Sequence, residues 1–252
     1  MRFKDKVVLL TGAGAGIGRA AALKYAKEGA KIIISDVSIK TREETLTLLN
    51  ELGAEAIYLQ GDVSNVEDVK RIIETAVSHF GRLDILVNCA GVVLPGSLET
   101  TTESDWDKTM DINVKGTFLM SKYAVEQMLK SGGGVVISIS SSVALKGVAD
   151  RIAYTASKGA IWSMTRAMAS EYMRRNIRFN TICPGTTYTP SLQQRINKFA
   201  DPEKALEDFI SRQPMGRLGK ESEIAEAILF ASDDEAAFMN GAALSIDGGM
   251  TI

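Results

Sequence analysis

The sequence predicts an α/β fold in which helices cover both faces of a doubly wound, seven-stranded parallel sheet. Apolar runs and helix-like stretches alternate from one end of the chain to the other. The first apolar run ends in a glycine-rich turn that opens a helix. No repeat or low-complexity tract divides the 252 residues, so we expect one domain over residues 1–252.

Seven apolar runs are predicted to be strands, over residues 6–10, 31–35, 56–59, 84–87, 135–139, 178–182 and 242–246. The main helices are predicted over residues 19–28, 42–52, 64–80, 104–130, 153–172 and 221–231. Alternation of strands and helices is typical of a parallel sheet, in which the carboxyl ends of the strands meet at one edge. We expect ligand contacts in the loops at that edge.

The glycine-rich turn after the first strand reads Thr11-Gly12-Ala13-Gly14-Ala15-Gly16-Ile17-Gly18. Glycines let the backbone approach a pyrophosphate, and the N–H groups and dipole of the following helix attract anions. Its spacing, Thr-Gly-x-x-x-Gly-x-Gly, differs from the usual G-x-G-x-x-G. The alternative is a merely flexible loop, but the flanking strand and helix favour a dinucleotide site of the Rossmann type.

Asp36 ends the second strand, eighteen positions after Gly18. A carboxylate at this point of a dinucleotide fold accepts a hydrogen bond from the ribose 2′-hydroxyl and repels a 2′-phosphate. Neither Ala15 nor Val37 supplies a cation that would offset this repulsion. The position therefore favours NAD over NADP, the alternative being an Asp that only ends the strand in a turn.

Small and polar residues follow the third and fourth strands. Asp62 and Val63 come after the third strand, and Asn88-Cys89-Ala90-Gly91 comes after the fourth, where small side chains allow a flat ligand to approach. Between these strands Ser64 precedes Glu67 by three residues, which predicts a helix N-cap with a capping box.

Tyr154 and Lys158 are four residues apart at the start of a predicted helix, so both lie on one face. Ser141 follows the fifth strand, thirteen positions before Tyr154. A phenol has a pKa of about 10, which a nearby cation lowers. We interpret the three residues as a proton-transfer device; in the alternative, Tyr154 packs in the core and Lys158 is solvated. Asn113, inside the predicted helix 104–130, either satisfies a hydrogen-bond defect or holds a water.

Composition argues against several classes of protein. The net charge of −2 gives no broad case for binding nucleic acid or an acidic membrane surface, and no apolar run is long enough to span a bilayer. No secretory signal is expected at the N-terminus. Cys89 and Cys183 suggest neither a disulfide framework nor a metal site, so a cytoplasmic protein without metal is expected. The single histidine, His79, falls at a predicted helix end, which leaves histidine-based hydrolases and zinc dehydrogenases without their main residue.

Together these motifs resemble the short-chain dehydrogenase/reductase family, in its NAD-preferring branch, over essentially the whole chain. The matching positions are Thr11, Gly12, Gly16, Gly18, Asp36, Asp62, Val63, Asn88, Ala90, Gly91, Asn113, Ser141, Tyr154, Lys158, Pro184, Gly185, Thr189 and the closing run 247–249. Cys89 departs from the family pattern, which usually repeats Asn there.

The resemblance implies an enzyme in which Tyr154 is the catalytic acid/base. Lys158 would lower its pKa and hold the nicotinamide ribose, Ser141 would hydrogen-bond the substrate oxygen, and Asn113 would position a water in a proton relay. Implied contacts with the cofactor NAD are Thr11, Gly12, Gly16, Ile17, Gly18, Asp36, Asp62, Val63, Asn88, Ala90, Gly91, Tyr154, Lys158, Pro184, Gly185, Thr187 and Thr189. The resemblance also implies a homotetramer built on helices 104–130 and 152–176.

Two arginines indicate the substrate. Arg151 lies three residues before Tyr154, and Arg195 lies in residues 188–217, a predicted helical insertion over the site. Guanidinium groups bind carboxylates bidentately, and the sequence around both arginines resembles that of relatives acting on short hydroxy acids and 3-deoxy sugar acids. We expect a small anionic secondary alcohol; the alternatives are surface salt bridges for the arginines and packed surface helices for the insertion.

Three rival functions stay open. A 3-oxoacyl-thioester reductase of the same fold would favour NADPH, against which Asp36 argues. A sugar 1-dehydrogenase would differ only in its substrate pocket. A nucleotide-sensing protein without turnover would not need the full set of Ser141, Tyr154 and Lys158.

Overall fold

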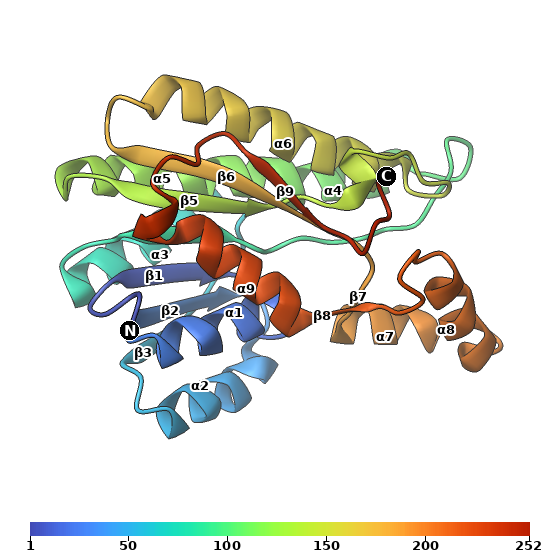
Figure 1. Ribbon diagram of the computed structural model, residues 1–252, viewed down its shortest axis with the longest axis horizontal. Coiled ribbons are helices and arrows are strands. Elements are labelled where there is room, and N and C mark those ends of the chain that lie inside the picture. The colour runs from blue at the N-terminus through green and yellow to red at the C-terminus, as the bar shows by residue number, and fades with distance from the viewer.

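The computed structural model describes residues 1–252 and has a seven-stranded parallel sheet at its centre (Figure 1). The strand order is β3-β2-β1-β4-β5-β6-β9, and every neighbouring pair is parallel. The strands are β1 (Val7–Thr11), β2 (Lys31–Asp36), β3 (Ala56–Gln60), β4 (Ile85–Asn88), β5 (Gly134–Ile139), β6 (Ile177–Pro184) and β9 (Ala243–Ile246). The predicted doubly wound sheet of seven strands is confirmed, with strand ends shifted by one or two residues.

Helices cover both faces of the sheet (Figure 1). On one face lie α1 (Gly16–Lys27), α2 (Arg42–Glu51) and α9 (Glu221–Ser232). The other face carries α3 (Val66–Phe80), α4 (Glu103–Met110), α5 (Gly116–Lys130) and α6 (Ile152–Tyr172). No helix is both long and apolar enough to cross a bilayer.

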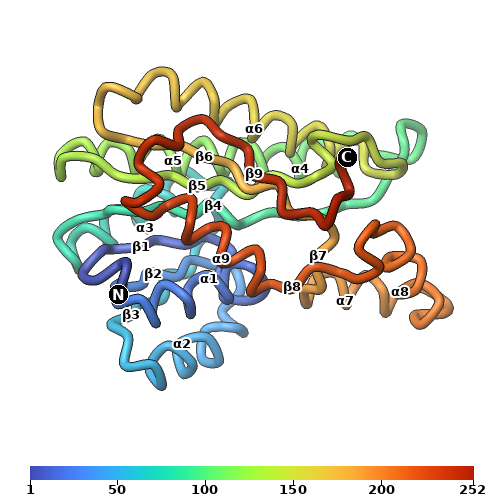
Figure 2. The backbone as a smooth tube through the Cα atoms, viewed as in Figure 1, coloured from blue at the N-terminus to red at the C-terminus, as the bar shows by residue number.

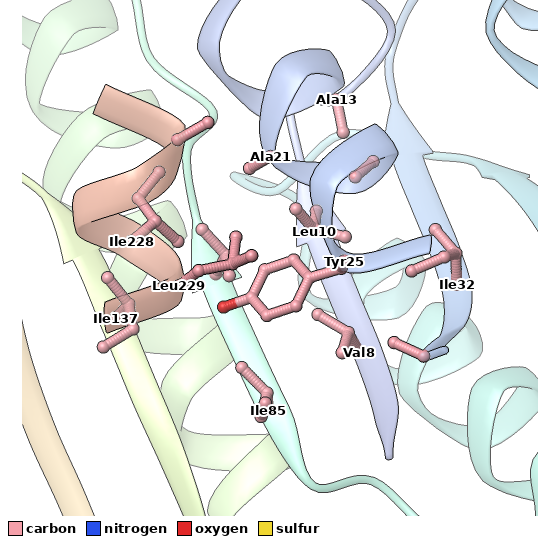
Figure 3. Close-up of a cluster of buried hydrophobic side chains, with 14 of the residues drawn as sticks. Val8, Leu10, Ala13, Ala21, Tyr25, Ile32, Ile85, Ile137, Ile228 and Leu229 are labelled. Carbon is pink, nitrogen blue, oxygen red and sulfur yellow. The ribbon is translucent and has the colours of Figure 1, made fainter. Parts of the chain in front are cut away.

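The core is divided by the sheet into two apolar clusters. Both clusters draw on the strands because a parallel sheet is buried on both faces, so Val7 to Leu10 are all inaccessible to solvent. Figure 3 shows the first cluster, where α1 and α9 close over the strands around Tyr25. The buried Tyr25 hydroxyl is satisfied by Ser232 Oγ at 2.6 Å, which ties α1 to α9.

The strand order reverses between β1 and β4, and this is where a ligand crevice forms in such sheets. Thr11 Oγ1, at the end of β1, accepts hydrogen bonds from the backbone N–H groups of Cys89 (3.2 Å) and Ala90 (3.1 Å), just after β4. A Cβ at Gly12 would lie 2.7 Å from Ala90 Cα, so only glycine fits there. The glycine loop is thereby fixed against the turn that follows β4.

Residues 188–217 stand apart from the sheet (Figure 2). A small parallel ladder of β7 (Thr187–Tyr188) and β8 (Gly219–Lys220) brings the ends of this excursion together, and two helices, α7 (Pro190–Ile196) and α8 (Pro202–Ser211), lie between them. Leu192 and Ile196 of α7, Ala205 of α8 and Leu218, just before β8, form a separate apolar cluster. The ladder was not predicted, because strands of two residues have no periodicity to detect.

Two local predictions need correction. The N-cap of α3 is Asn65, whose Oδ1 accepts from the N–H groups of Glu67 (2.9 Å) and Asp68 (3.2 Å); Ser64 is not the cap, because its hydroxyl donates to Asp62. The predicted continuous helix 104–130 contains a π-helical turn at Asp111–Lys115 between α4 and α5.

Candidate active site

The N-terminus of α1 is open to an anion. Its N-cap, Ala15, makes no side-chain capping bond, and the first turn contains no acidic residue, so no capping side chain occupies its first backbone N–H groups. Gly16 has φ +63°, and a Cβ at Gly18 would lie 2.7 Å from the Gly12 carbonyl oxygen. This bare backbone cradle fits the pyrophosphate of a dinucleotide.

Asp36 is fixed at the end of β2, beside the glycine loop. Its Oδ2 accepts a hydrogen bond from Gly14 N at 3.0 Å, and its Oδ1 accepts one from Ser38 N at 2.9 Å. No salt bridge involves Asp36, so its negative charge is not offset by an ion pair. Asp36 thus lies at the end of β2 against Gly14, and its contact with a ribose 2′-hydroxyl stays a prediction.

The Asp62 side chain stabilises the turn after β3, and the Val63 side chain packs against α5. Asp62 Oδ1 accepts from Ser64 N at 2.8 Å and from Ser64 Oγ at 2.7 Å. Val63 packs on Gly116, where an added Cβ would lie 2.6 Å from Val63 Cγ2. The Val63 side chain therefore belongs to the junction of this turn with α5.

Asn88 also has a structural role. It is buried at the end of β4, and its Nδ2 donates to Ser121 Oγ of α5 at 3.0 Å. The Gly91 backbone lies beside two of the predicted catalytic residues. A Cβ at Gly91 would be 3.1 Å from Asn113 Oδ1 and 3.5 Å from Lys158 Nζ. The turn after β4 thus brings bare backbone beside both residues.

Helix α6 presents Tyr154 and Lys158 on one face, against the end of β5. Lys158 is buried, and its Nζ donates to the Ile139 carbonyl oxygen at 2.7 Å. Ser140 Oγ donates to the Lys158 carbonyl oxygen at 2.7 Å, so the end of β5 and the residue after it hold this lysine by its backbone and its ammonium. The ammonium lies 5.5 Å from the centre of the Tyr154 ring.

The electrostatics differ from the sequence expectation. Burial raises the pKa of Tyr154, and the Ser141 hydroxyl and the guanidinium groups of Arg195 and Arg151 offset part of the rise. Burial also lowers the pKa of Lys158 to about 8. Burial therefore outweighs the neighbouring cations, and the pKa of Tyr154 is raised, where the sequence predicts that Lys158 lowers it.

Asn113 lies in the π-helical turn and makes three side-chain hydrogen bonds. Its Oδ1 accepts from Val92 N (2.8 Å), and its Nδ2 donates to the Val92 carbonyl oxygen (3.1 Å) and to Ser157 Oγ (3.0 Å). Ser157 Oγ in turn donates to the Tyr154 carbonyl oxygen at 2.7 Å. The Asn113 side chain therefore connects the loop at Val92 to α6, and both of its amide hydrogens form hydrogen bonds.

The loop after β6 completes the rim of the site. Thr187 Oγ1 donates to the Gly185 carbonyl oxygen at 3.1 Å, and Pro184 offers its carbonyl oxygen to Ser141 Oγ at 3.5 Å. Thr189 Oγ1 caps α7 by accepting from Leu192 N at 3.2 Å. This rim connects the sheet edge directly to the helices of residues 188–217.

A cavity of about 210 Å³ opens beside Tyr154 and Ser141, and three arginines line it. Arg151 and Arg195 are half-buried, and Arg212 is exposed. No carboxylate forms a salt bridge with any of the three, and Arg195 Nε is buried without a hydrogen-bond partner. Desolvation lowers the pKa of Arg151 and of Arg195, and repulsion from a neighbouring guanidinium adds to each shift. The cavity is a preformed positive site beside the phenol.

The structure thus brings both tentative substrate residues to Tyr154, and adds two residues that the sequence did not single out. Arg212 reaches the cavity from just beyond α8, and its only sequence signal is its place in the insertion with Arg195. Ser157 precedes Lys158, and no sequence pattern pointed to it, because its role depends on a hydrogen bond with Asn113, which lies 44 positions away.

A larger groove, of about 820 Å³, lies at the opposite edge of the sheet, where the strands begin. Lys6, Asp84 and Arg178 contribute to its lining, and none of the motif residues does. The small cavity beside Tyr154 is therefore the candidate site, because Tyr154, Ser141 and Ile17 of the glycine loop all line it.

Comparisons with known proteins show the family and the fold of this chain. A family model described as enoyl-(acyl carrier protein) reductase matches residues 12–251. An "uncharacterized oxidoreductase" of Thermotoga maritima is 51% identical over 251 residues, covering 100% of this chain and 99% of its own. "Dehydrogenase/reductase SDR family member 6" of Aquarana catesbeiana is 39% identical over 252 residues, with the same coverage. The crystal structure of levodione reductase matches with a TM-score of 0.96 and 35% identity over 99% of each chain. The chain belongs to the short-chain dehydrogenase/reductase family of oxidoreductases.

Proposed function

We propose that this oxidoreductase interconverts a small anionic secondary alcohol and its ketone, using NAD and NADH. One observation carries the proposal: Arg151 and Arg195 line the cavity beside Tyr154, and neither forms a salt bridge with a carboxylate. Two half-buried guanidinium groups without an acidic partner are costly unless a ligand supplies the negative charge. A hydroxy acid or sugar-derived acid supplies a carboxylate that can bind them bidentately.

In this proposal Tyr154 Oη exchanges a proton with the substrate oxygen, and Ser141 Oγ hydrogen-bonds that oxygen. Because its pKa is raised, Tyr154 carries its proton at neutral pH and donates it when a ketone is reduced. Lys158, held by Ile139, faces the nicotinamide ribose. The cofactor, when bound in the cleft of Gly16 and Asp36, supplies or accepts the hydride.

The substrate proposal is tested with Arg151→Ala and the control Arg166→Ala, which removes an exposed arginine of α6, the helix that follows Arg151. A panel of hydroxy acids, sugar acids, free sugars and a 3-oxoacyl thioester is assayed with NAD or NADH by absorbance. We expect Arg151→Ala to lower kcat/KM for an acid by roughly 10- to 100-fold, the loss of a charged hydrogen-bond pair. The neutral analogue of that acid should lose little.

Equal losses for the acid and its neutral analogue would refute the carboxylate contact. Activity confined to the thioester or to free sugars would favour the rival enzymes. The cofactor proposal fails if kcat/KM is higher with NADPH than with NADH, since the uncompensated Asp36 carboxylate should repel the 2′-phosphate.

We also propose that the protein is a cytoplasmic homotetramer. Both cysteines are free thiols, as in reducing compartments. Large apolar side chains are exposed on α4 and α5 (Trp106, Phe118) and on and just after α9 (Phe230, Phe238), which are surfaces for a second copy. Light scattering of the purified protein measures the native mass that this assembly requires.

A further inference from the structure

The Arg19 guanidinium of α1 links the glycine loop to Glu44 of α2. Arg19, in the first turn of α1, donates to the Gly14 carbonyl oxygen from Nε at 3.0 Å and from Nη2 at 2.5 Å. The same guanidinium forms a bidentate pair with Glu44 of α2, from Nη1 to Oε1 at 2.6 Å and from Nη2 to Oε2 at 2.9 Å. The buried Thr45 donates from Oγ1 to the same Gly14 carbonyl oxygen at 3.0 Å. The Gly14 carbonyl is therefore held by both helices.

Gly14 connects Arg19 to Asp36. Its N–H donates to Asp36 Oδ2, while its carbonyl oxygen receives the Arg19 guanidinium, so the two charges flank one glycine. No side chain fits between them, because a Cβ at Gly14 would lie 2.1 Å from Thr41 Oγ1 and 2.9 Å from Asp36 Oδ2. Two carboxylates and one guanidinium thus surround the Gly14 peptide, and their charges sum to −1.

We propose that Glu44 helps to select the cofactor, by occupying the Arg19 guanidinium that would otherwise offset the charge of Asp36. A guanidinium binds a phosphate with the same fork of N–H donors that it uses for a carboxylate. Because Glu44 already occupies the N–H donors of Arg19, a ribose 2′-phosphate beside Asp36 faces a net negative charge and a cation that is already paired. This inference rests on the proposed dinucleotide cleft and extends the choice of NAD to a residue on another helix.

Binding of two nucleotides that lack nicotinamide tests the proposal without turnover. ADP-ribose and its 2′-phosphate are titrated calorimetrically into wild type, Glu44→Gln, Glu44→Ala and the control Glu43→Gln. Glu43 is an exposed carboxylate in the same first turn of α2 and forms no salt bridge. The two Glu44 variants should bind the 2′-phosphate about fivefold more tightly at low salt, as one exposed ion pair allows. Their affinity for ADP-ribose should change less than about twofold.

Two further measurements test whether the gain in affinity for the 2′-phosphate depends on the charge of Arg19. Adding Arg19→Met to Glu44→Gln should abolish the gain, and salt at about 0.5 M should reduce it by screening. A gain that persists without Arg19, or Glu44 variants that behave like Glu43→Gln, would overturn the role of Glu44 while leaving the cofactor proposal intact. A folded wild type that binds neither nucleotide would overturn the dinucleotide cleft, and this inference with it.

Discussion

Tyr154 is subject to opposing influences that the residues around it impose. Burial favours the neutral phenol, whereas the Ser141 hydroxyl and the charges of Arg195 and Arg151 favour the phenolate. Since burial prevails, the phenol is the resting form. The arginines that we assign to the substrate therefore also influence the proton-transfer group, which links substrate charge to catalysis.

This balance predicts opposite pH dependences for the two directions of the reaction. Oxidation of the alcohol needs the phenolate, so its kcat/KM should rise as pH increases from about 7 to 10. Reduction of the ketone needs the phenol and should lose activity towards the alkaline end of the same range. Initial rates in both directions across this pH range measure the effect.

Removing the hydroxyl of Tyr154 tests whether this residue moves the proton. Tyr154→Phe should lower kcat by roughly 10²- to 10⁴-fold, the usual contribution of a general acid or base, and should keep cofactor affinity. Tyr172→Phe, at the other end of α6, should leave activity unchanged. An active Tyr154→Phe enzyme with the wild-type pH profile would show that another group moves the proton.

At the scale of the elements, α3 shows how the choice of one capping residue is made. Ser64 and Asn65 are both good N-cap residues, and the capping-box spacing to Glu67 favoured Ser64. Asp62 engages the Ser64 hydroxyl, and Asn65 then receives the free N–H groups of α3. The turn after β3 therefore decides where α3 begins.

Two alanine substitutions distinguish these roles. Asn65→Ala should lower the free energy of unfolding by about 1 kcal/mol, because the N–H groups of Glu67 and Asp68 lose their acceptor. Ser64→Ala should cost less than half of that, since no helical N–H depends on it. Urea unfolding followed by circular dichroism measures both; equal losses would contradict the assignment of Asn65.

The π-helical turn between α4 and α5 has a consequence for the site. It places Asn113 where its amide reaches Val92 on one side and Ser157 of α6 on the other. π-helical turns of this kind often occur at functional sites. Here the turn couples the start of α5 to the backbone of Tyr154 through one serine.

At the scale of the whole molecule, the two layered faces form large cores, while residues 188–217 rely on a small one. Each face of the sheet buries an extensive apolar cluster, but the cluster that holds α7 and α8 has four buried residues, Leu192, Ile196, Ala205 and Leu218. A segment with little buried apolar area opens at low free energy. From this contrast we propose that residues 188–217, the predicted insertion over the site, act as a lid that carries Arg195 and Arg212.

Hydrogen exchange tests the lid. Backbone amides of α7 and α8 should exchange faster than those of α9, a helix of similar length to α8 that packs in the main core. Saturation with NADH and the anionic substrate should slow exchange in α7 and α8, because their arginines then bind the ligand. Equal protection of α8 and α9 in the free protein would argue for a fixed surface segment.

Much of the fold could be predicted from the sequence because the sequence patterns that specify it are local. A strand of Val, Leu and Ile buried on both faces, a glycine loop and a helical period each lie within a few residues. The same holds for Tyr154 and Lys158, whose spacing alone places them on one helical face. Elements that depend on contacts at a distance, such as the β7–β8 ladder, left no such signal.

By itself, the sequence determined the layered fold, the glycine cradle and the pairing of Tyr154 with Lys158. Only the tertiary structure decided that burial outweighs nearby cations at Tyr154, that Arg151, Arg195 and Arg212 share one cavity, and that Glu44 engages Arg19. The physical reason is that charge and solvation act through space. The pKa of a phenol and the partner of an arginine depend on groups that the chain brings together from distant positions.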